Sequence, residues 1–321
     1  MRLYTPGRSD GCPLSLSVVP DGAGELSHAE LQNIARGAAE SLGSMLNYGK
    51  SPQAQARISV IIKAVEILAQ RGVQITLPVL FEYIAEPDEI LVTELGRLPS
   101  KHREKVVEDL QMLHINQQPL FAQEGDPLNG DLLFGRGRWA EPGRTRLSII
   151  STKFLGDTTN IQFWVAQLLL ELHRWLNKNP ASGLQAVVML DEADMYLPAS
   201  SRPATKEPLE SLLRRARSAG LGVFLATQSP GDLDYRARDN IGTWMLGRIQ
   251  QARAIEKLRP LLADLGADVA DELAGQTTGE FFLAHAGNTA GIKSMRSAVL
   301  AEQLADHEIL ETARINCAPQ P

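Results

Sequence analysis

"LQAVVMLDEADMYLP", residues Leu184–Pro198, decides the fold of this sequence. An apolar run of strand length ends at Leu190, and the acidic residues Asp191 and Glu192 follow at once. A strand without polar alternation is typical of a parallel sheet that helices cover on both faces. Open α/β sheets bind ligands at the carboxyl ends of such strands. We therefore predict a buried strand with an acidic site at its end; the alternative is an acidic turn after a core strand.

Strand-length and helical segments alternate around this stretch. From Gly143 onward the segments are "TRLSIIS", "TNIQFWVAQLLLELHRWL", "LQAVVML", "KEPLESLLRRARSAG", "LGVFLAT", "GTWMLGRI" and "QARAIEKLRPLLADLG". This alternation predicts an α/β fold with a mostly parallel sheet. The stretch "GEFFLAHAGNTAGIKSMRSAV" predicts a hairpin with its turn near Gly287 and Asn288.

A helical segment interrupts this pattern in the first half of the chain. Between Ser27 and Gln123 the apolar residues recur at helical spacing. Ser51 and Pro52 are predicted as the N-cap and first residue of the second helix, and Gly72 as its end. We predict N-terminal strands that join the sheet at 1–26, an all-helical insertion at 27–125, an α/β core at 126–315 and a flexible tail at 316–321.

Composition narrows the class of protein. The 321 residues are 44% hydrophobic and 22% charged, which is typical of a globular protein. A net charge of -6 argues against a surface that binds polyanions everywhere, although it is compatible with a local basic stripe. Charged residues break every long apolar run, so we expect a cytoplasmic protein without a membrane segment. Cys12 and Cys317 lie near opposite ends, and we expect neither a thiolate metal site nor a disulfide framework.

A second strand supports a ligand site beside the acidic pair. "LGVFLAT" ends at Thr227 and Gln228, which emerge beside Asp191 if the two strands are neighbours. In nucleoside triphosphatases an acid at such a place serves the magnesium shell, and a neutral amide can position the attacking water or contact a terminal phosphate. The alternative for Gln228 is an ordinary polar loop residue.

These strand ends carry a resemblance to a known family. "VVMLDEADMYLP" followed by "SLLRRARSAGLGVFLATQSPGDLD" resembles the HerA/FtsK superfamily of P-loop ATPases. "YTPGRSDGCPLSL", "FLGDTTNIQFWVAQLLLEL" and "GTWMLGRI" are similar to bacterial HerA-like ATP-binding proteins. The resemblance implies a RecA-like P-loop NTPase core that uses ATP and Mg²⁺, and a hexameric ring. It also implies ATP hydrolysis coupled to DNA translocation or unwinding, with a nuclease or another protein as a candidate partner.

The same resemblance implies roles for single residues. Asp191 and Glu192 would be the Walker B pair, with Asp191 holding Mg²⁺ through water and Glu192 activating the attacking water. Gln228 would sense the γ-phosphate, and Thr227 would line the nucleotide site beside it.

Arginines could complete the site from a neighbouring subunit. In the resembling family an arginine before the glutamine enters the neighbour's site, and Arg217 is our first choice and Arg215 our second. Arg248 follows another expected strand and is a weaker candidate for contacting phosphate. The alternative for all three is a solvated surface arginine.

A regular phosphate loop is missing from the sequence. The nearest string is "GSMLNYGKS", Gly43–Ser51, where five residues separate Gly43 from Gly49 and a helical pattern precedes the string. The motif GxxxxGK[ST] needs four intervening residues and a preceding strand. Lys50 and Ser51 therefore fit the end of one helix and the cap of the next. In the family the loop lies upstream of "YTPGRSDG", so we expect a carboxyl-terminal portion of a larger ATPase that alone neither binds ATP tightly nor hydrolyses it.

Two other functions are open at this point. The chain could be a catalytically inactive assembly or regulatory subunit that kept the fold without the phosphate loop. A DEAD-box RNA helicase is disfavoured, because "ATQ" stands where that class has a Ser-Ala-Thr step and the later arginine-rich motif is missing.

Overall fold

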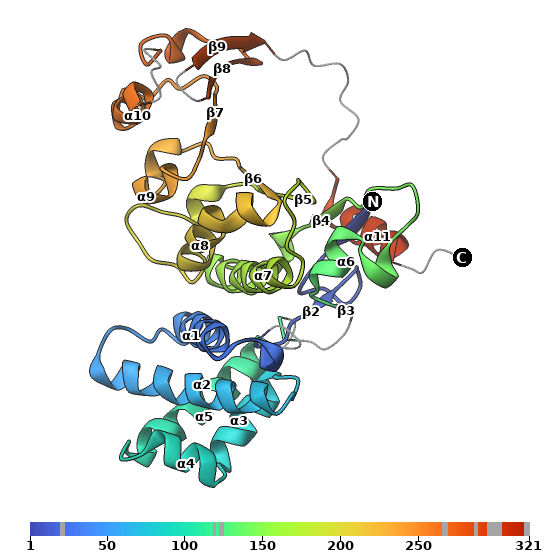
Figure 1. Cartoon of the computed structure of the whole chain (residues 1–321), viewed down its shortest axis with the longest axis vertical. Coiled ribbons are helices and arrows are strands. Elements are labelled where there is room, and N and C mark those ends of the chain that lie inside the picture. The colour runs from blue at the N-terminus through green and yellow to red at the C-terminus, as the bar shows by residue number, and fades with distance from the viewer. Residues whose placement is uncertain are drawn as a thin grey trace.

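Figure 1 shows a computed structural model of the chain, which describes residues 1–19, 23–117, 120–121, 125–264, 269–285, 288–293 and 304–317. The helices in these ranges are α1 (His28–Met45), α2 (Pro52–Gln70), α3 (Leu77–Ala85), α4 (Glu89–Leu95), α5 (Ser100–Asn116), α6 (Gly130–Phe134), α7 (Thr158–Lys178), α8 (Lys206–Ala216), α9 (Tyr235–Arg238), α10 (Ala252–Asp264) and α11 (Asp306–Cys317). The strands are β1 (Arg2–Tyr4), β2 (Leu14–Ser15), β3 (Asp126–Pro127), β4 (Ser148–Ile150), β5 (Ala186–Leu190), β6 (Leu221–Leu225), β7 (Thr243–Leu246), β8 (Glu280–His285) and β9 (Asn288–Lys293).

The strands form separate parallel pairs and one antiparallel sheet. β1 pairs with β4, β2 with β3 and β5 with β6, each in parallel. β7, β8 and β9 form a three-stranded antiparallel sheet. The chain is therefore α/β, as predicted, but the described residues do not join the parallel pairs into the one mostly parallel sheet that the sequence indicated. The pairs β1–β4 and β2–β3 are short, with strands of three and two residues, and offer few backbone groups for a longer ladder.

Helices α1 to α5 form the lower part of the molecule in Figure 1. The Ser51 side chain caps α2 by accepting a hydrogen bond from the Ala54 amide, and Pro52 is the first helical residue. α2 ends at Gln70, and Gly72 follows in a left-handed conformation with φ of 70°. These three local predictions are confirmed. The string "GSMLNYGKS" is thus the end of α1, a short loop and the cap of α2.

α7 is the central helix of the structure. It contacts α1 on one side and α8 on the other, and Phe163 and Trp164 are 1% exposed. Glu171 is also buried, and its carboxylate accepts hydrogen bonds from Arg174 at 2.6 Å and from the Gly130 amide at 2.7 Å. Such pairing offsets the cost of burying the charge. Within the described ranges, every helix is too short or too polar to traverse a lipid bilayer.

The antiparallel sheet has a small core of its own. α10 packs on this sheet through Leu258 and Leu262, which meet Trp244 and Leu246 of β7. β8 and β9 form the predicted hairpin, with His285 paired to Asn288. The predicted turn residue Gly287 lies outside the described residues.

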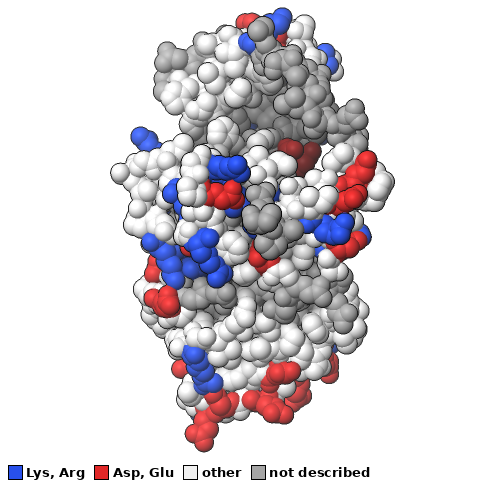
Figure 2. All heavy atoms as spheres, turned by 90° about the vertical axis from the view of Figure 1, so that its right-hand side faces the viewer, with Lys and Arg blue, Asp and Glu red and all other residues white. Residues whose placement is uncertain are grey.

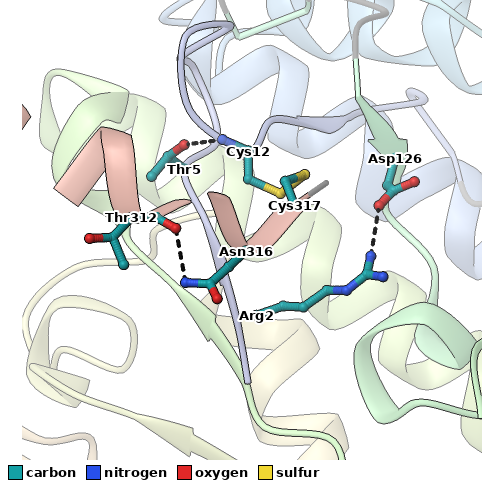
Figure 3. The surroundings of a disulfide bond; sticks show 7 residues. All are labelled: Arg2, Thr5, Cys12, Asp126, Thr312, Asn316 and Cys317. Atoms are coloured by element: carbon teal, nitrogen blue, oxygen red, sulfur yellow. Dashed lines mark hydrogen bonds and ion pairs between the residues drawn. A yellow bond between two sulfur atoms is a disulfide. The ribbon is translucent and has the colours of Figure 1, made fainter. Parts of the chain in front are cut away.

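The expectation that the two cysteines form no disulfide is wrong. Cys12 and Cys317 form a disulfide with Cα atoms 5.4 Å apart (Figure 3). α11 lies beside β1 and buries Leu310 and Ala313, and this packing brings residues that are 305 positions apart in the sequence together. The Cys12 amide donates a hydrogen bond to the Thr5 hydroxyl at 2.9 Å on the same loop. α11 extends through Cys317, two residues into the expected tail, and residues 318–321 lie outside the described ranges.

Removing the disulfide is expected to destabilise the protein. The double variant Cys12→Ala, Cys317→Ala should lower the free energy of unfolding by about 2–5 kcal/mol, because the bridge restricts the unfolded chain over a long loop. Urea unfolding with and without a reducing agent measures this difference. The reductant should bring the wild-type midpoint down toward that of the double variant and leave the double variant unchanged. A wild-type urea midpoint that is the same with and without the reductant would contradict the disulfide.

The α1–α2 junction gives a second test. Ser51→Ala should lower the free energy of unfolding by about 1 kcal/mol through loss of the helix cap. Lys50→Ala is the matched control at the adjacent exposed position, and it should change stability by less than about 0.5 kcal/mol. Thermal unfolding of both variants measures the difference, and equal effects would argue against a helix junction here.

Candidate functional site

The carboxyl ends of β5 and β6 meet at one edge of their sheet. The strands run in parallel with Leu190 opposite Leu225, so the loops that follow them begin side by side. Two backbone hydrogen bonds of 2.9 Å join these loops, one from the Ala226 amide to Leu190 and one from the Ala193 amide to Ala226. The structure therefore brings Asp191–Glu192 and Thr227–Gln228 together, as expected for neighbouring strands.

Glu192 and Gln228 make direct contact. The Gln228 side-chain amide donates a hydrogen bond to Glu192 Oε1 at 3.0 Å, and both side chains are exposed. A carboxylate at this place can accept a proton from water, and a neutral amide next to it can hold that water without adding charge. A base and a neutral donor therefore lie within hydrogen-bond distance of each other.

The backbone of Glu192 is held in an unfavourable conformation. Its φ of 52° and ψ of 46° are left-handed, and Asn47 is the other non-glycine residue with positive φ in the described part of the chain. This conformation costs an L-residue with a Cβ about 1–2 kcal/mol. The Glu192 amide donates a hydrogen bond to Asp191 Oδ1 at 3.0 Å, and this contact helps to hold the turn. Strain of this kind gathers at functional sites, where the fold must place one side chain.

Thr227 organises the loop that carries Gln228. Its hydroxyl donates a hydrogen bond to Asp194 Oδ1 at 2.5 Å and accepts one from the Ser229 amide at 2.9 Å. From the sequence we expected Thr227 to line a nucleotide site and Asp194 to have no role beyond following the acidic pair. In the structure the hydroxyl proton of Thr227 is committed to Asp194. The signal for this contact was the third acid of "DEAD", two residues after Glu192.

The edge of the sheet is negatively charged. Asp191 and Glu192 are exposed, and Asp194 is half-buried beside them. Burial raises the pKa of the Tyr196 hydroxyl, and the charges of Asp191 and Glu192 raise it further, so this hydroxyl stays protonated at neutral pH. Carboxylate oxygens are ligands that Mg²⁺ prefers, and a negative site attracts such a cation.

The predicted arginines lie elsewhere in the same chain. Arg215 and Arg217 lie before the start of β6, and Gln228 lies after its end. The length of β6, about 13 Å, therefore separates the two arginines from Gln228. The Arg215 guanidinium donates a hydrogen bond to Asn177 at 2.8 Å, and Arg217 is exposed. Arg248 is exposed and lies two residues after the end of β7. Among the described residues, no hydrogen bond or ion pair joins any of the three to Glu192 of its own chain.

The side chains present fit half of a nucleotide site. Asp191 and Glu192 suit a hydrated magnesium ion, and Gln228 suits a water or a phosphate oxygen. A phosphate cradle needs a glycine-rich turn between a strand and a helix. Gly43 lies inside α1 and Ser51 caps α2, so the one candidate string in the sequence does not form that turn. The side chains at this edge therefore have the chemistry to hold a hydrated Mg²⁺ and a water, and the described residues from Gly43 to Ser51 do not form a phosphate-binding turn.

The strain at Glu192 can be measured without any ligand. Glu192→Gly and Glu192→Ala both remove the carboxylate, but only glycine adopts a left-handed backbone freely. We expect the glycine variant to have a free energy of unfolding about 1 kcal/mol higher than the alanine variant. Urea unfolding of the two variants tests this, and an alanine variant at least as stable as the glycine variant would contradict the left-handed backbone.

Solved structures resemble the chain although its sequence has no match among known family models or curated proteins. VirB4 of Thermoanaerobacter pseudethanolicus superposes with a TM-score of 0.62 at 14% identity, over 96% of this chain and 77% of VirB4. The plasmid coupling protein TrwB, solved with ADP and Mg²⁺, superposes with a TM-score of 0.55 at 15% identity, over 94% of this chain and 80% of TrwB. At such identity the likeness shows the fold. The chain shares the fold of these two proteins.

Proposed function

We propose that this chain is the water-activating part of a HerA/FtsK-like ATPase that hydrolyses ATP at subunit interfaces. The contact between Glu192 and Gln228 carries the proposal, because it pairs a base with a neutral donor at the carboxyl edge of a parallel sheet. In this proposal Asp191 supplies an oxygen to the water shell of Mg²⁺. Glu192 accepts the proton of the attacking water, and Gln228 orients that water.

The placement of the arginines supports action between subunits. Arg217 is exposed at the sheet edge opposite Glu192, so it can serve a site only in a neighbouring copy. A guanidinium supplied in trans stabilises the charge of a phosphoryl transition state. We propose a homo-oligomeric ring, a hexamer by the family resemblance, with Arg217 as the finger and Arg215, which Asn177 holds, as the second candidate.

DNA is the proposed cargo of this ring. TrwB is a bacterial conjugative coupling protein, and this likeness supports a role in DNA movement. On the face shown in Figure 2, Lys and Arg lie mainly across the middle of the molecule, where Asp and Glu are interspersed with them, and the helical end carries mostly Asp and Glu. The helical end would therefore repel a polyanion more than the middle does.

A second candidate function follows from the missing phosphate cradle. The junction between α1 and α2 occupies the string that would have to bind phosphate. An assembly or regulatory subunit without catalysis accounts for that observation. The two functions can be distinguished, because only the ATPase would hydrolyse ATP once a phosphate loop is supplied.

Calorimetric titration of Mg-ATP into the chain is expected to show no saturable binding. The reason is that the carboxylates and the amide at the strand ends would hold Mg²⁺ and water, whereas the candidate string does not form the glycine-rich turn that holds phosphates. Lys50→Ala should give the same flat titration as the wild-type chain. Tight binding that disappears in Lys50→Ala would show that "GSMLNYGKS" is an irregular phosphate loop.

In a complex that hydrolyses ATP, complementary variants test the interface. Glu192→Gln should lower kcat about 10²–10⁴-fold while nucleotide affinity is kept, because it removes only the base. Arg217→Ala should lower kcat about 10³-fold or more. Mixed rings of the two variants should recover part of the activity, since some interfaces then combine an intact Glu192 with an intact Arg217.

Arg214→Ala is the matched control, because Arg214 is a neighbouring exposed arginine of the same cluster. It should hydrolyse ATP at a rate close to that of the wild-type chain. If Arg217→Ala turns over at the wild-type rate, another arginine must be the finger. If Glu192→Gln turns over at the wild-type rate, Glu192 is not the base.

A further inference from the structure

A buried lysine opens α8, where local preferences disfavour one. Lys206 is the first residue of this helix and is 7% exposed. A positive charge in the first turn opposes the helix dipole, and a lysine is rarely buried unless it is paired. The preceding Thr205 does not cap the helix, because its hydroxyl donates a hydrogen bond to the Tyr196 carbonyl oxygen at 2.9 Å. The start of α8 therefore uses its polar side chains for contacts outside the helix.

The ammonium group of Lys206 is fully satisfied by these contacts. It donates hydrogen bonds to the carbonyl oxygens of Pro198 at 2.7 Å and Ser201 at 3.2 Å. It also forms an ion pair with Asp234 Oδ2 at 2.7 Å. An ammonium group has three donors, and the three oxygens match that number. This complete pairing offsets the cost of burying the charge.

The partner carboxylate is also buried and charged. Asp234 is 6% exposed, and its other oxygen accepts a hydrogen bond from the Arg236 amide at 2.8 Å at the start of α9. Burial by itself would raise the pKa of Asp234, but Lys206 and the Arg236 amide outweigh it, and the pKa lies below its ordinary value. The carboxylate therefore stays ionised at neutral pH and faces the ammonium group.

The ion pair joins the two loops that leave the candidate site. Lys206 follows the loop after β5, and Asp234 follows the loop after β6. Two backbone hydrogen bonds of 2.8 Å lie beside the pair, one from the Ala199 amide to the Asp232 carbonyl and one from the Asp234 amide to the Leu197 carbonyl. The loop after β5 and the loop after β6 are thus fastened to each other at a place away from the sheet edge.

The contact between Glu192 and Gln228 depends on these loops. Both side chains are exposed, and a single hydrogen bond between exposed groups adds little stability by itself. Groups that act together in catalysis must be held within about 0.5 Å of their working geometry by the residues behind them. The bond of Thr227 to Asp194 ties the loops close to the site, and the ion pair ties them at their far ends.

We propose that Lys206 is a positioning residue for the Glu192–Gln228 pair. Its ammonium group holds the loop after β5 through two carbonyl oxygens and the loop after β6 through Asp234. Lys206 acts through the two loops and not on a reacting atom. The positioning rests on the contacts of this chain, whereas its effect on catalysis rests on the proposed ATPase function.

The side-chain amide of Gln228 gives a direct signal for the test. Its NMR signal in the full chain is assigned by its absence in Gln228→Ala. Glu192→Gly removes the carboxylate and keeps the left-handed backbone, so it shows where the signal lies when the hydrogen bond is lost. Variants of Lys206 should move the signal more than half of the way from the wild-type position to that position.

Two variants separate positioning from folding. Lys206→Met keeps the apolar stem and removes the ammonium group, which leaves a buried carboxylate unpaired and destabilises the chain. The double variant Lys206→Met, Asp234→Asn removes both charges and should fold with a stability close to that of the wild-type chain. The new asparagine can still cap α9. The Gln228 signal should move in the double variant as well.

Lys63→Met is the matched control in the helical part of the chain. Lys63 lies on α2 and pairs with Glu66 at 3.0 Å and with Glu94 at 3.2 Å. Its removal also breaks ion pairs of a lysine, but these pairs do not join the loops of the candidate site. The Gln228 signal should therefore stay at its wild-type position in Lys63→Met.

Hydrogen exchange distinguishes local loosening from general destabilisation. In the double variant the amides of residues 199 and 234 should exchange about tenfold faster or more, because the loops they join are no longer fastened by charge. The amides of the ladder between β5 and β6 should exchange as in the wild-type chain. Equal acceleration of the ladder amides would show a merely structural role and overturn the proposal.

The outcomes separate the positioning role from the proposed function. A Gln228 signal that moves in both Lys206 variants and not in Lys63→Met supports the proposal. A signal at the wild-type position in the folded double variant, or an equal displacement in Lys63→Met, overturns it. In a complex that hydrolyses ATP, the double variant should lower kcat about tenfold or more and change KM less than about twofold. If the signal moves and kcat does not change, the positioning stands and the catalytic role of Gln228 fails.

Discussion

The parallel ladder between β5 and β6 is the constraint on which the site depends. Its register sets Leu190 opposite Leu225, so the two following loops begin at the same height. A slip of one residue would move Gln228 about 3.3 Å along the strand and turn every side chain of β6 to the other face. The buried face prevents that slip, because Leu221 would leave the core and Phe224 would enter it. Hydrophobic burial within the strands thus fixes the position of the Glu192–Gln228 contact, which lies beyond their ends.

The same alternation gives the β5–β6 pair two different faces. α7 and α8 cover one face, and the second face remains apolar and exposed. Burying an exposed apolar side chain of this size would contribute roughly 1.5–3 kcal/mol. The register of one ladder therefore decides both which side chains enter the core and which stay exposed.

Elsewhere, contacts between distant parts of the chain organise the structure. α7 lies between the helical part and the strands, and its buried aromatic residues belong to the core that both share. The disulfide holds α11 to the loop after β1. A reducing environment would release this bridge and leave α11 anchored by Leu310 and Ala313 and their neighbours.

Much of the fold and half of the candidate site could be predicted from the sequence. The strand of residues 186–190, the cap at Ser51 and the polar strand ends are local signals, because each depends on neighbouring residues or on the period of a single element. The tertiary structure decided the disulfide, the left-handed backbone of Glu192 and the bond between Thr227 and Asp194. It also decided that the parallel strands form separate pairs and that one face of β5–β6 stays open. These features arise where segments far apart in the chain meet, and no local pattern records which segments will be neighbours.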